Sequence, residues 1–302
     1  MTLRPPALRP GDQIRVIAPA SPFDKLRFKK GVAVFEDLGF KVVWREDVFE
    51  SERYLAGTDA RRAAEIAEAF ADPATKGIVC ARGGYGTPRI LPSLDFKKLS
   101  ATPKVLVGFS DITALLLAMH TNGLVGFHGP NVTGRISEVG LDVDEKKSFL
   151  RTVGSPEPAG TVANGRTVVE GRAEGPLLGG NLAMVTALLG TKYSPDYKGA
   201  ILFLEDVGEK PFRLDRMMTH LKLAGVLDAV AGFALGRFSK CVNDADSSVI
   251  GGEVVAAIAG ATGKPCLVDL PFGHDGENRT LPLGVRARIA NGTLEILEAA
   301  VT

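Results

Sequence analysis

The chain has 302 residues, of which 45% are apolar, and a formal net charge of +1 at pH 7. A chain of this length exceeds one typical domain and has enough apolar residues for two cores. Lysine and arginine are spread along the whole sequence, so no basic stripe indicates a nucleic acid or an anionic membrane as a partner, and we expect neither.

The cysteines and the first residues bear on the compartment. Cys80, Cys241 and Cys266 are an odd, widely spaced set that forms neither a disulfide framework nor a metal knuckle. The opening MTLRPPALRPGD contains no apolar signal core, and no uninterrupted apolar run approaches the length of a membrane span. We therefore expect reduced thiols and a cytoplasmic protein.

The first part of the chain alternates between strand and helix patterns. A short apolar strand at residues 14–20 precedes a helix pattern that begins at Asp24 and stops at Gly39. The later predicted elements are strand 40–44, helix 59–71, strand 77–82, strand 104–109 with a helix directly after it, and strand 124–128. Such alternation is typical of a parallel sheet covered by helices on both faces. We predict a Rossmann-like N-terminal domain over residues 1–136.

The composition changes beyond this domain. Residues 137–175 are first polar and then rich in glycine and proline, and we interpret them as the connection between two domains. The elements predicted after it are a helix capped by Asn181, the strand AILFLED, a helix that stops at Gly225, and two strands paired across the Asn291-Gly292 turn. We predict a smaller, β-rich α/β domain over residues 176–302, and thus a two-domain α/β protein.

The segment KVLVGFSDITALLLAMH, residues 104–120, passes from an apolar strand through Ser110 directly into an apolar helix. The serine hydroxyl would project at the carboxyl edge of the sheet, where open α/β sheets bind ligands. The N–H of Asp111 would point toward an oxyanion formed at Ser110, with the helix dipole adding favourable potential. For the dipeptide alone an N-cap is the commoner explanation, and Ile112 departs from the G-x-S-x-G pattern, so both interpretations stay open.

A serine nucleophile needs a base, and the base needs an acid to orient it. Among the four histidines, His120 closes the apolar helix, His220 suits packing on an amphipathic helix, and His128 ends a strand where a hydrogen bond to a turn would explain it. His274 ranks first because it lies in LPFGHDGENRTLPLG, a turn-rich loop whose side chains are free to converge on a cleft.

Two other strand ends carry candidate site residues. Glu205 and Asp206 end an apolar strand, and composition does not choose between a solvated strand tip and a site. The run ARGGYG, residues 81–86, follows another strand; its glycines would allow an anion or oxyanion nest, or only a plain turn. Its spacing is not that of the dinucleotide fingerprint G-x-G-x-x-G, and no phosphate loop or His-Glu metal pair occurs. We therefore do not expect a nucleotide-dependent oxidoreductase.

Taken together, these segments resemble the serine LD-carboxypeptidases, a family that includes muropeptide carboxypeptidases and microcin-immunity peptidases. The resemblance covers nearly the whole chain. It rests on segments that occur in the family's order: LRPGDQIRVIAPAS, ARGGYGTPRILPSLD, VGFSDITAL, FHGP, PLLGGNLAMVTALLGT, ILFLEDVGEKPFRLDRMMTHLKLAG and GHDGENRTLPLG.

The resemblance implies a triad of Ser110, Glu205 and His274, with the backbone of Asp111 and Gly84 as oxyanion hole and with no metal or organic cofactor. The nucleophile would lie in the first domain and its partners in the second, so the site would be an inter-domain cleft. The implied substrate is a small peptide, a murein tetrapeptide that loses its terminal D-alanine through an acyl-enzyme during cell-wall recycling in the cytoplasm. The family's habit also implies a homodimer.

Other interpretations stay open. The microcin-immunity branch cleaves a peptidyl-nucleotide, for which residues 137–175 could supply a stacking loop, whereas the only tryptophan, Trp44, looks like a core residue. A non-catalytic peptide-binding homologue would keep the cleft but would be expected to lose the triad. Arg82, Arg213 and Arg216 could pair with substrate carboxylates, but surface ion pairs explain them equally well.

Overall fold

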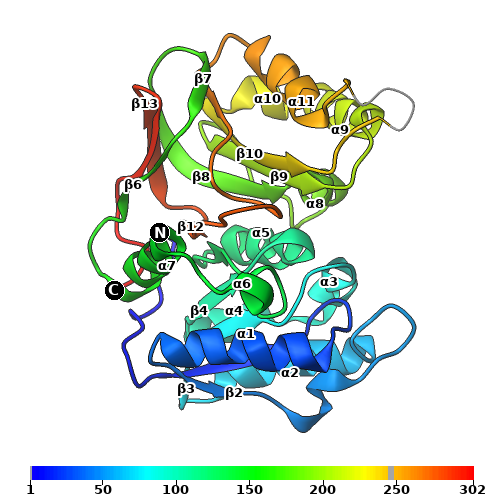
Figure 1. The fold of residues 1–302 in the computed structure, drawn as a ribbon, viewed down its shortest axis with the longest axis vertical. Helices are drawn as coiled ribbons and strands as arrows, with labels where there is room; N and C mark the ends of the chain where they lie inside the picture. The colour runs from blue at the N-terminus through cyan, green and yellow to red at the C-terminus, as the bar shows by residue number, and fades with distance from the viewer. Residues whose placement is uncertain (1, 244–247) are drawn as a thin grey trace.

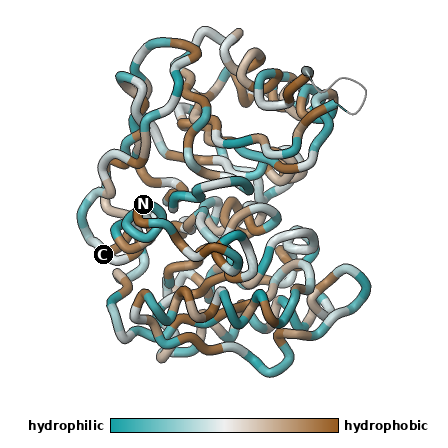
Figure 2. Tube along the Cα trace, in the orientation of Figure 1, coloured by the Kyte–Doolittle hydropathy of each residue, from teal (hydrophilic) through white to brown (hydrophobic). Residues whose placement is uncertain are grey.

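The structure is a computed structural model that describes residues 2–243 and 248–302. The chain forms two α/β domains, each built on its own sheet, and helix α5 (Thr113–Thr121) lies between them (Figure 1). The tube in Figure 2 alternates between hydrophilic and hydrophobic residues along α1 (Lys25–Asp37), as an amphipathic helix with one buried face requires. No helix among the described residues is long and apolar enough to cross a membrane.

The first sheet has six strands in the order β12-β5-β4-β3-β1-β2. Its strands are β1 (Gln13–Ile17), β2 (Lys41–Val43), β3 (Thr75–Cys80), β4 (Val105–Gly108), β5 (Phe127–His128) and β12 (Leu281–Pro282). All pair in parallel except β12, which is antiparallel to β5. The direction of winding reverses between β1 and β3, the point at which open parallel sheets bind ligands. The predicted parallel sheet is thus confirmed.

The first part of the chain contains the three predicted helices and two shorter ones, at residues 87–90 and 96–101, that the alternation does not predict. They are α1, α2 (Asp59–Ala71), α3 (Thr87–Ile90), α4 (Phe96–Ala101) and α5, with short 3₁₀ turns η1 (Glu46–Phe49), η2 (Leu91–Ser93) and η3 (Ser110–Ile112). The carboxylate of Asp24 caps α1 by accepting a hydrogen bond from the N–H of Arg27 at 2.8 Å. The strand predicted over residues 14–20 is shorter because residues 18–20 leave the sheet and form the loop at its carboxyl edge.

Residues 137–175 contain more regular structure than their composition indicated. The elements in and around this segment are α6 (Ile136–Val139), α7 (Val143–Gly154), β6 (Gly160–Asn164), β7 (Arg166–Val169) and the start of β8 (Ala173–Asn181). Helix α7 forms because Asp142 and Glu145 make a reciprocal capping box. It packs on the first domain through Phe149, whose ring centroid lies 5.7 Å from that of Phe35.

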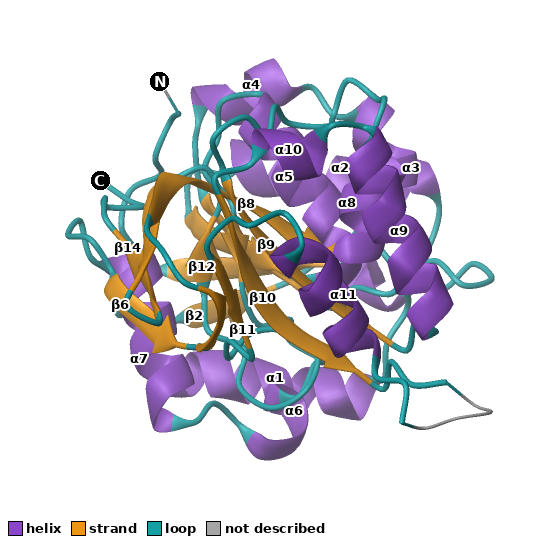
Figure 3. Cartoon of the chain, turned by 90° about the horizontal axis from the view of Figure 1, so that it is seen from above, coloured by secondary structure: helices purple, strands orange, loops and turns teal. Residues whose placement is uncertain are grey.

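The second sheet has eight strands in the order β6-β14-β13-β8-β9-β10-β11-β7. The strands not yet given are β9 (Ile201–Val207), β10 (Gly232–Ser239), β11 (Cys266–Val268), β13 (Arg286–Ala290) and β14 (Thr293–Ile296). Its helices are α8 (Leu182–Leu188), α9 (Pro211–Leu223), α10 (Val226–Ala229) and α11 (Gly251–Gly260), and Figure 3 shows α8, α9 and α11 on one side of the twisted sheet. The predicted Asn181 cap and the predicted hairpin at Asn291 and Gly292 are both present.

Two contacts fix the position of one domain against the other. Strand β12 lies beyond β11 in sequence, yet Leu281 pairs with His128 in the first sheet, so the loop between β11 and β12 runs from one domain to the other. At the end of β8, a Cβ atom on Gly180 would lie 2.6 Å from the Cγ2 and Oγ1 atoms of Thr113 in α5. The backbone of the second domain therefore lies directly against the helix that follows Ser110.

Candidate active site

Ser110 occupies the sharp turn between β4 and α5. Its φ angle of 67° is in the left-handed region, which is uncommon for a residue with a side chain. Neither Ser110 nor Asp111 caps a helix, because no side-chain cap bond is found at either η3 or α5. The N-cap interpretation is therefore wrong, and the strained strand-to-helix turn has the backbone shape of a nucleophile elbow.

The glycine run after β3 lies against this turn. A Cβ atom on Gly83 would lie 2.8 Å from the Cβ of Ser110 and 3.1 Å from its Oγ, so only glycine fits. Gly84, the next residue, is exposed and has a φ of 99°. No hydrogen bond within the described residues uses the main-chain N–H of Gly84 or of Asp111. Two main-chain donors that form no bond among the described residues thus belong to segments that adjoin Ser110.

His274, in the loop between β11 and β12, meets Glu205 of β9. The Nδ1 atom of His274 lies 2.6 Å from Oε2 of Glu205, which is fully buried near the end of β9. Because a carboxylate only accepts, this bond places the proton on Nδ1 and leaves Nε2 available as a base. The imidazole ring centroid lies 4.8 Å from the ring of Phe109, the residue before Ser110. The structure therefore brings Glu205 and His274 into contact beside Phe109, the residue that precedes Ser110.

Burial and charge act in opposite directions on His274. Burial lowers the pKa of its imidazole, but the charge of Glu205 and the hydrogen bond to it outweigh burial, and Asp206 adds to them. The net effect raises the pKa of His274 above its usual value of 6.5. The site thus stabilises the imidazolium that a proton transfer to His274 would form.

Glu205 and Asp206, which composition could not rank, have different partners. Asp206 accepts hydrogen bonds from Nδ2 of Asn181 at 2.9 Å and from the N–H of Ala183 at 3.0 Å. Burial, followed by the charge of Glu205, raises the pKa of the Asp206 carboxyl to about 6. Asp206 therefore holds the start of α8, whereas Glu205 alone bonds to His274.

Asn278 is a site residue that the sequence did not mark. Its Oδ1 lies 3.2 Å from the N–H of Gly273, which donates to it, and 3.2 Å from Nε2 of His128. Its own N–H donates to Oε1 of Glu145 at 2.8 Å. Asn278 therefore fixes the loop that carries His274, and a single asparagine in a polar loop has no pattern that would have revealed this.

The other histidines are not placed as bases. Burial lowers the pKa of His128 to about 4, and its bond to Asn278 agrees with the prediction of a histidine held by a turn. Burial also lowers the pKa of His120, which disfavours the charged form that a helix C-terminus would suit. His220 is exposed on α9, so the prediction that it packs is wrong.

A small pocket of about 20 Å³ adjoins His274. Its lining includes Phe109, Asn131, Arg135, Glu145 and Asn278. Arg135 forms an ion pair with Glu145, whose side chain is 1% exposed. The pocket has room for about one water molecule beside the imidazole.

The three arginines left open by the sequence all have partners within the chain. Arg82 donates to the carbonyl of Pro22 at 2.8 Å, and Arg213 lies 3.6 Å from Glu209. The guanidinium of Arg216 lies 5.9 Å from the ring centroid of Phe212. These contacts agree with surface roles and do not single out a substrate ligand.

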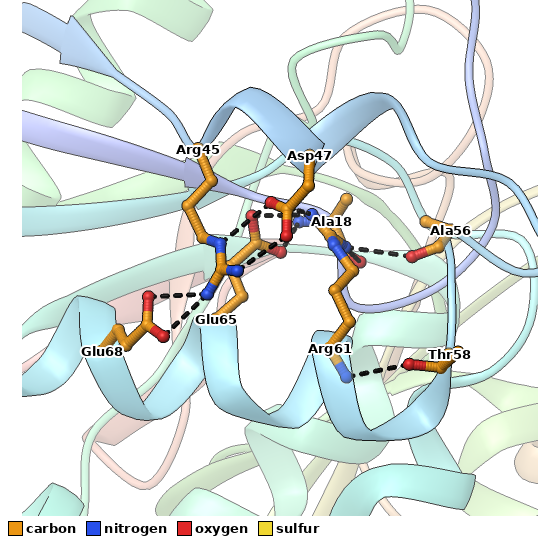
Figure 4. Close-up of polar contacts among 8 residues, drawn as sticks. All are labelled: Ala18, Arg45, Asp47, Ala56, Thr58, Arg61, Glu65 and Glu68. Carbon is orange, nitrogen blue, oxygen red and sulfur yellow. Dashed lines mark hydrogen bonds and ion pairs between the residues drawn. The ribbon is translucent and has the colours of Figure 1, made fainter.

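Helix α2 inserts a buried ion pair under the loop that follows β1 (Figure 4). Arg61 donates to the carbonyls of Ala18 at 3.3 Å and Ala56 at 3.0 Å, and also to Glu65 at 3.1 Å. Glu65 in turn accepts from the N–H of Ala18 at 2.7 Å. Burial raises the pKa of Glu65 to about 7, although Arg61 opposes the rise. This ion pair holds the carboxyl end of β1, which adjoins the glycine run.

Two further observations concern ligands. Among residues 2–243 and 248–302, no group of three or more His, Cys, Asp or Glu side chains could hold a metal ion.

Trp44 is 40% exposed and packs edge-on against Phe28, so its assignment to the core is wrong. Phe149, the only aromatic residue of segment 137–175, is buried, so this segment presents no stacking surface.

Models of two protein domains match the chain. The LD-carboxypeptidase N-terminal domain matches residues 14–129, and the LD-carboxypeptidase C-terminal domain matches residues 174–289. A Pseudomonas aeruginosa protein named murein tetrapeptide carboxypeptidase is 33% identical, covering 93% of this chain and 94% of its own length.

Solved structures agree with these matches. The muramoyltetrapeptide carboxypeptidase from Oxalobacter formigenes has a TM-score of 0.85 at 32% identity, covering 96% of this chain and 100% of that one. MccF in complex with glutamyl sulfamoyl guanosine has a TM-score of 0.90 at 28% identity, covering 99% and 100%. By sequence, the Escherichia coli microcin C7 self-immunity protein MccF is 30% identical over 90% of this chain and 88% of its own length.

Proposed function

Because the chain belongs to the LD-carboxypeptidase family, we propose that it is a serine carboxypeptidase that removes the terminal D-alanine from murein tetrapeptides. The bond cleaved joins the L-centre of diaminopimelate or lysine to D-alanine. The observation that carries the proposal is the 2.6 Å contact between His274 and the buried Glu205, beside a serine held at a φ of 67°.

In the proposed reaction Ser110 is the nucleophile and His274 the base. Nε2 of His274 takes the hydroxyl proton as Oγ bonds to the scissile carbonyl carbon, and the same proton then passes to the departing D-alanine amine as the C–N bond breaks. Water attacks the acyl-enzyme by the same route and restores the serine. Glu205 keeps the imidazole tautomer fixed and stabilises its charged form, in agreement with the raised pKa of His274.

The main-chain N–H groups of Gly84 and Asp111 are proposed to bind the oxyanion. Both belong to segments in contact with Ser110, and neither is used elsewhere among the described residues. Donors of this kind act in the transition state, when the carbonyl oxygen becomes negative, and losing one typically costs about 10²–10³-fold in rate. No step of this mechanism calls for a metal or an organic cofactor.

A peptidyl-nucleotide is the second candidate substrate, because the fold matches MccF with a TM-score of 0.90. Bases are commonly bound by stacking on exposed aromatic rings. The only aromatic residue in segment 137–175 is the buried Phe149, which favours the murein peptide over a nucleotide.

As part of the same proposal, the enzyme acts as a cytoplasmic homodimer in the recycling of cell-wall fragments.

The test is release of D-alanine from L-Ala-γ-D-Glu-meso-diaminopimelate-D-Ala, with an all-L peptide and the Ser110→Ala variant as controls. We expect release by the wild type from the LD bond alone, and loss of at least about 10³-fold in the variant with folding retained. Equal activity of Ser110→Ala would exclude this serine as nucleophile. No release by the wild type would favour peptidyl-nucleotide cleavage or a non-catalytic peptide-binding protein.

A further inference from the structure

The glycine run owes its shape to residues outside it. Ser21, in the loop after β1, donates its N–H to the carbonyl of Gly83 at 3.2 Å and accepts from the N–H of Tyr85 at 3.0 Å. A Cβ atom on Gly84 would lie 2.5 Å from Oγ of Ser21. Gly84 is exposed and lies outside any strand, so contacts with neighbouring segments determine the position of its N–H.

Arg62 of α2 lies beneath the far end of this run and is fully buried. Its NH1 atom donates to the carbonyl of Gly86 at 2.9 Å and also to the carbonyl of Pro19. Its NH2 atom pairs with Asp59, which in turn binds Arg89 of α3 at 2.8 Å. One guanidinium therefore joins the loop after β1 to the loop after β3.

Asp111 completes the connection to the nucleophile turn. Its side chain is 2% exposed, and Oδ2 accepts a hydrogen bond from the N–H of Thr87 at 2.8 Å. Burial raises the pKa of this carboxyl, while hydrogen bonding from Thr87 and Gly86 and the charge of Arg62 oppose the rise. The two segments that carry the free N–H groups are thus linked through Gly86 and Thr87.

We propose that Arg62 is a positioning residue that sets the separation of the two oxyanion donors, Gly84 and Asp111, through its hold on Gly86. The inference rests on the function proposed above and adds a residue remote from the substrate to it. Arg62 contacts neither Ser110 nor His274 in the structure, so its effect has to act through the backbone of residues 83–87.

A buried cation can also be purely structural, and the chain contains a matched example. Lys104, 7% exposed at the amino end of β4, donates to the carbonyls of Asp72 and Thr75. It thus resembles Arg62 in burial and in binding two main-chain carbonyls, but it lies at the opposite end of the strand that leads to Ser110. Arg62→Met and Lys104→Met therefore remove equivalent groups at the active and inactive ends of the sheet.

The experiment measures kcat and KM for D-alanine release by the wild type and both variants at a temperature where all are folded. Arg62→Met should lower kcat by roughly 10²-fold with KM changed less than about threefold, because a misplaced donor weakens transition-state binding selectively. Lys104→Met should change kcat less than about threefold, even if its Tm falls as far as that of Arg62→Met. Arg62→Lys keeps the cation but lacks the planar fork, so it should lower kcat by about tenfold and serves as the reporter if Arg62→Met does not fold.

A second readout separates positioning from general destabilisation. A peptidyl boronic acid ending at diaminopimelate would form a tetrahedral adduct with Ser110, with one boronate oxygen at the donors. Its Ki should rise in the Arg62 variants by the factor lost from kcat/KM, while the Kd of the tripeptide product stays constant. Arg62 variants with wild-type kcat and wild-type boronate affinity would overturn this inference but leave the proposed function intact. An inactive wild type would contradict the proposed function and this inference with it.

Discussion

At the scale of single residues, the polar chemistry depends on which of two adjacent carboxylates faces the histidine. Glu205 and Asp206 are both buried, but successive side chains of β9 point to opposite faces of the sheet. Glu205 therefore bonds to His274, and Asp206 binds Asn181 and the N-terminus of α8. The alternation of side chains along β9 places the two carboxylates on opposite faces of the sheet, and the residues on each face determine which partner each carboxylate binds.

The pH dependence of activity should report this pairing. Since His274 has to be neutral to act as a base and its pKa is raised, kcat/KM should rise with pH through an acid limb above pH 6.5. Glu205→Gln removes the charge that opposes burial, so the limb should move to lower pH, and kcat should fall by about 10²–10⁴-fold. The measurement is a kcat/KM profile over about pH 5 to 9.

Asp206→Asn is the matched control for that profile. It removes the neighbouring charge but leaves the bond between Glu205 and His274, so it should shift the limb less and keep kcat within about tenfold. An acid limb at the same pH in wild type and Glu205→Gln would show that His274 is not the titrating base.

At the scale of elements, the close approach of β8 to α5 sets the distance between the two halves of the site. Gly180 has a φ of 131° and lies against Thr113, whose Oγ1 accepts from the N–H of Asn181 at 3.1 Å. Ser110 precedes α5, and Glu205 lies on β9, which pairs with β8. A change at this contact therefore acts on the nucleophile and its partners together.

Gly180→Ala should push β8 away from α5, because its Cβ would fall 2.6 Å from two atoms of Thr113. We expect kcat/KM to fall by about tenfold or more, together with a lower Tm. Gly199→Ala is the control: it has a φ of 70° but nothing within 4 Å of the added Cβ. It should cost about 1 kcal/mol of unfolding free energy and leave kcat/KM unchanged. Equal kinetics in the two variants would contradict the role of this contact.

At the scale of the whole molecule, the chain crosses between its domains more often than a simple two-domain order implies. Besides β12, which joins the first sheet from late in the sequence, the C-terminal Thr302 donates its N–H to the carbonyl of Pro5 at 2.9 Å. Helix α7 packs on the first domain through Phe149. These crossings should couple the stability of the two sheets.

We therefore expect the two domains to unfold in one cooperative transition. Trp44 is the only tryptophan and lies in the first domain, so its fluorescence reports that domain, whereas far-UV circular dichroism reports both. The two urea midpoints should coincide. Leu281→Ala in β12 should reduce the unfolding free energy by about 2–5 kcal/mol and so lower both midpoints together. Separate midpoints would mean that the domains are only loosely coupled.

The amino-acid pattern was sufficient for the alternation of strands and helices in the first domain, for its parallel sheet and for the strand-to-helix turn that carries Ser110. These features depend on hydrophobic periodicity, helix caps and glycine positions, which are local properties of the chain. Helix α7 differs from the prediction of a connection: the polar composition of residues 137–175 favours a linker, but Asp142 and Glu145 form a capping box that starts a helix.

Composition did not choose between Glu205 and Asp206, and only the resemblance to the family implied Glu205; the bond from Glu205 to His274, the role of Asn278 and the burial of Arg62 became visible only in the tertiary structure. Each depends on partners that are distant along the chain, since an isolated charged or polar side chain has no sequence pattern that names its partner. A buried charge or amide is stable only where the fold supplies a hydrogen-bonding group, so its function becomes visible only when the strands and loops that surround it have come together.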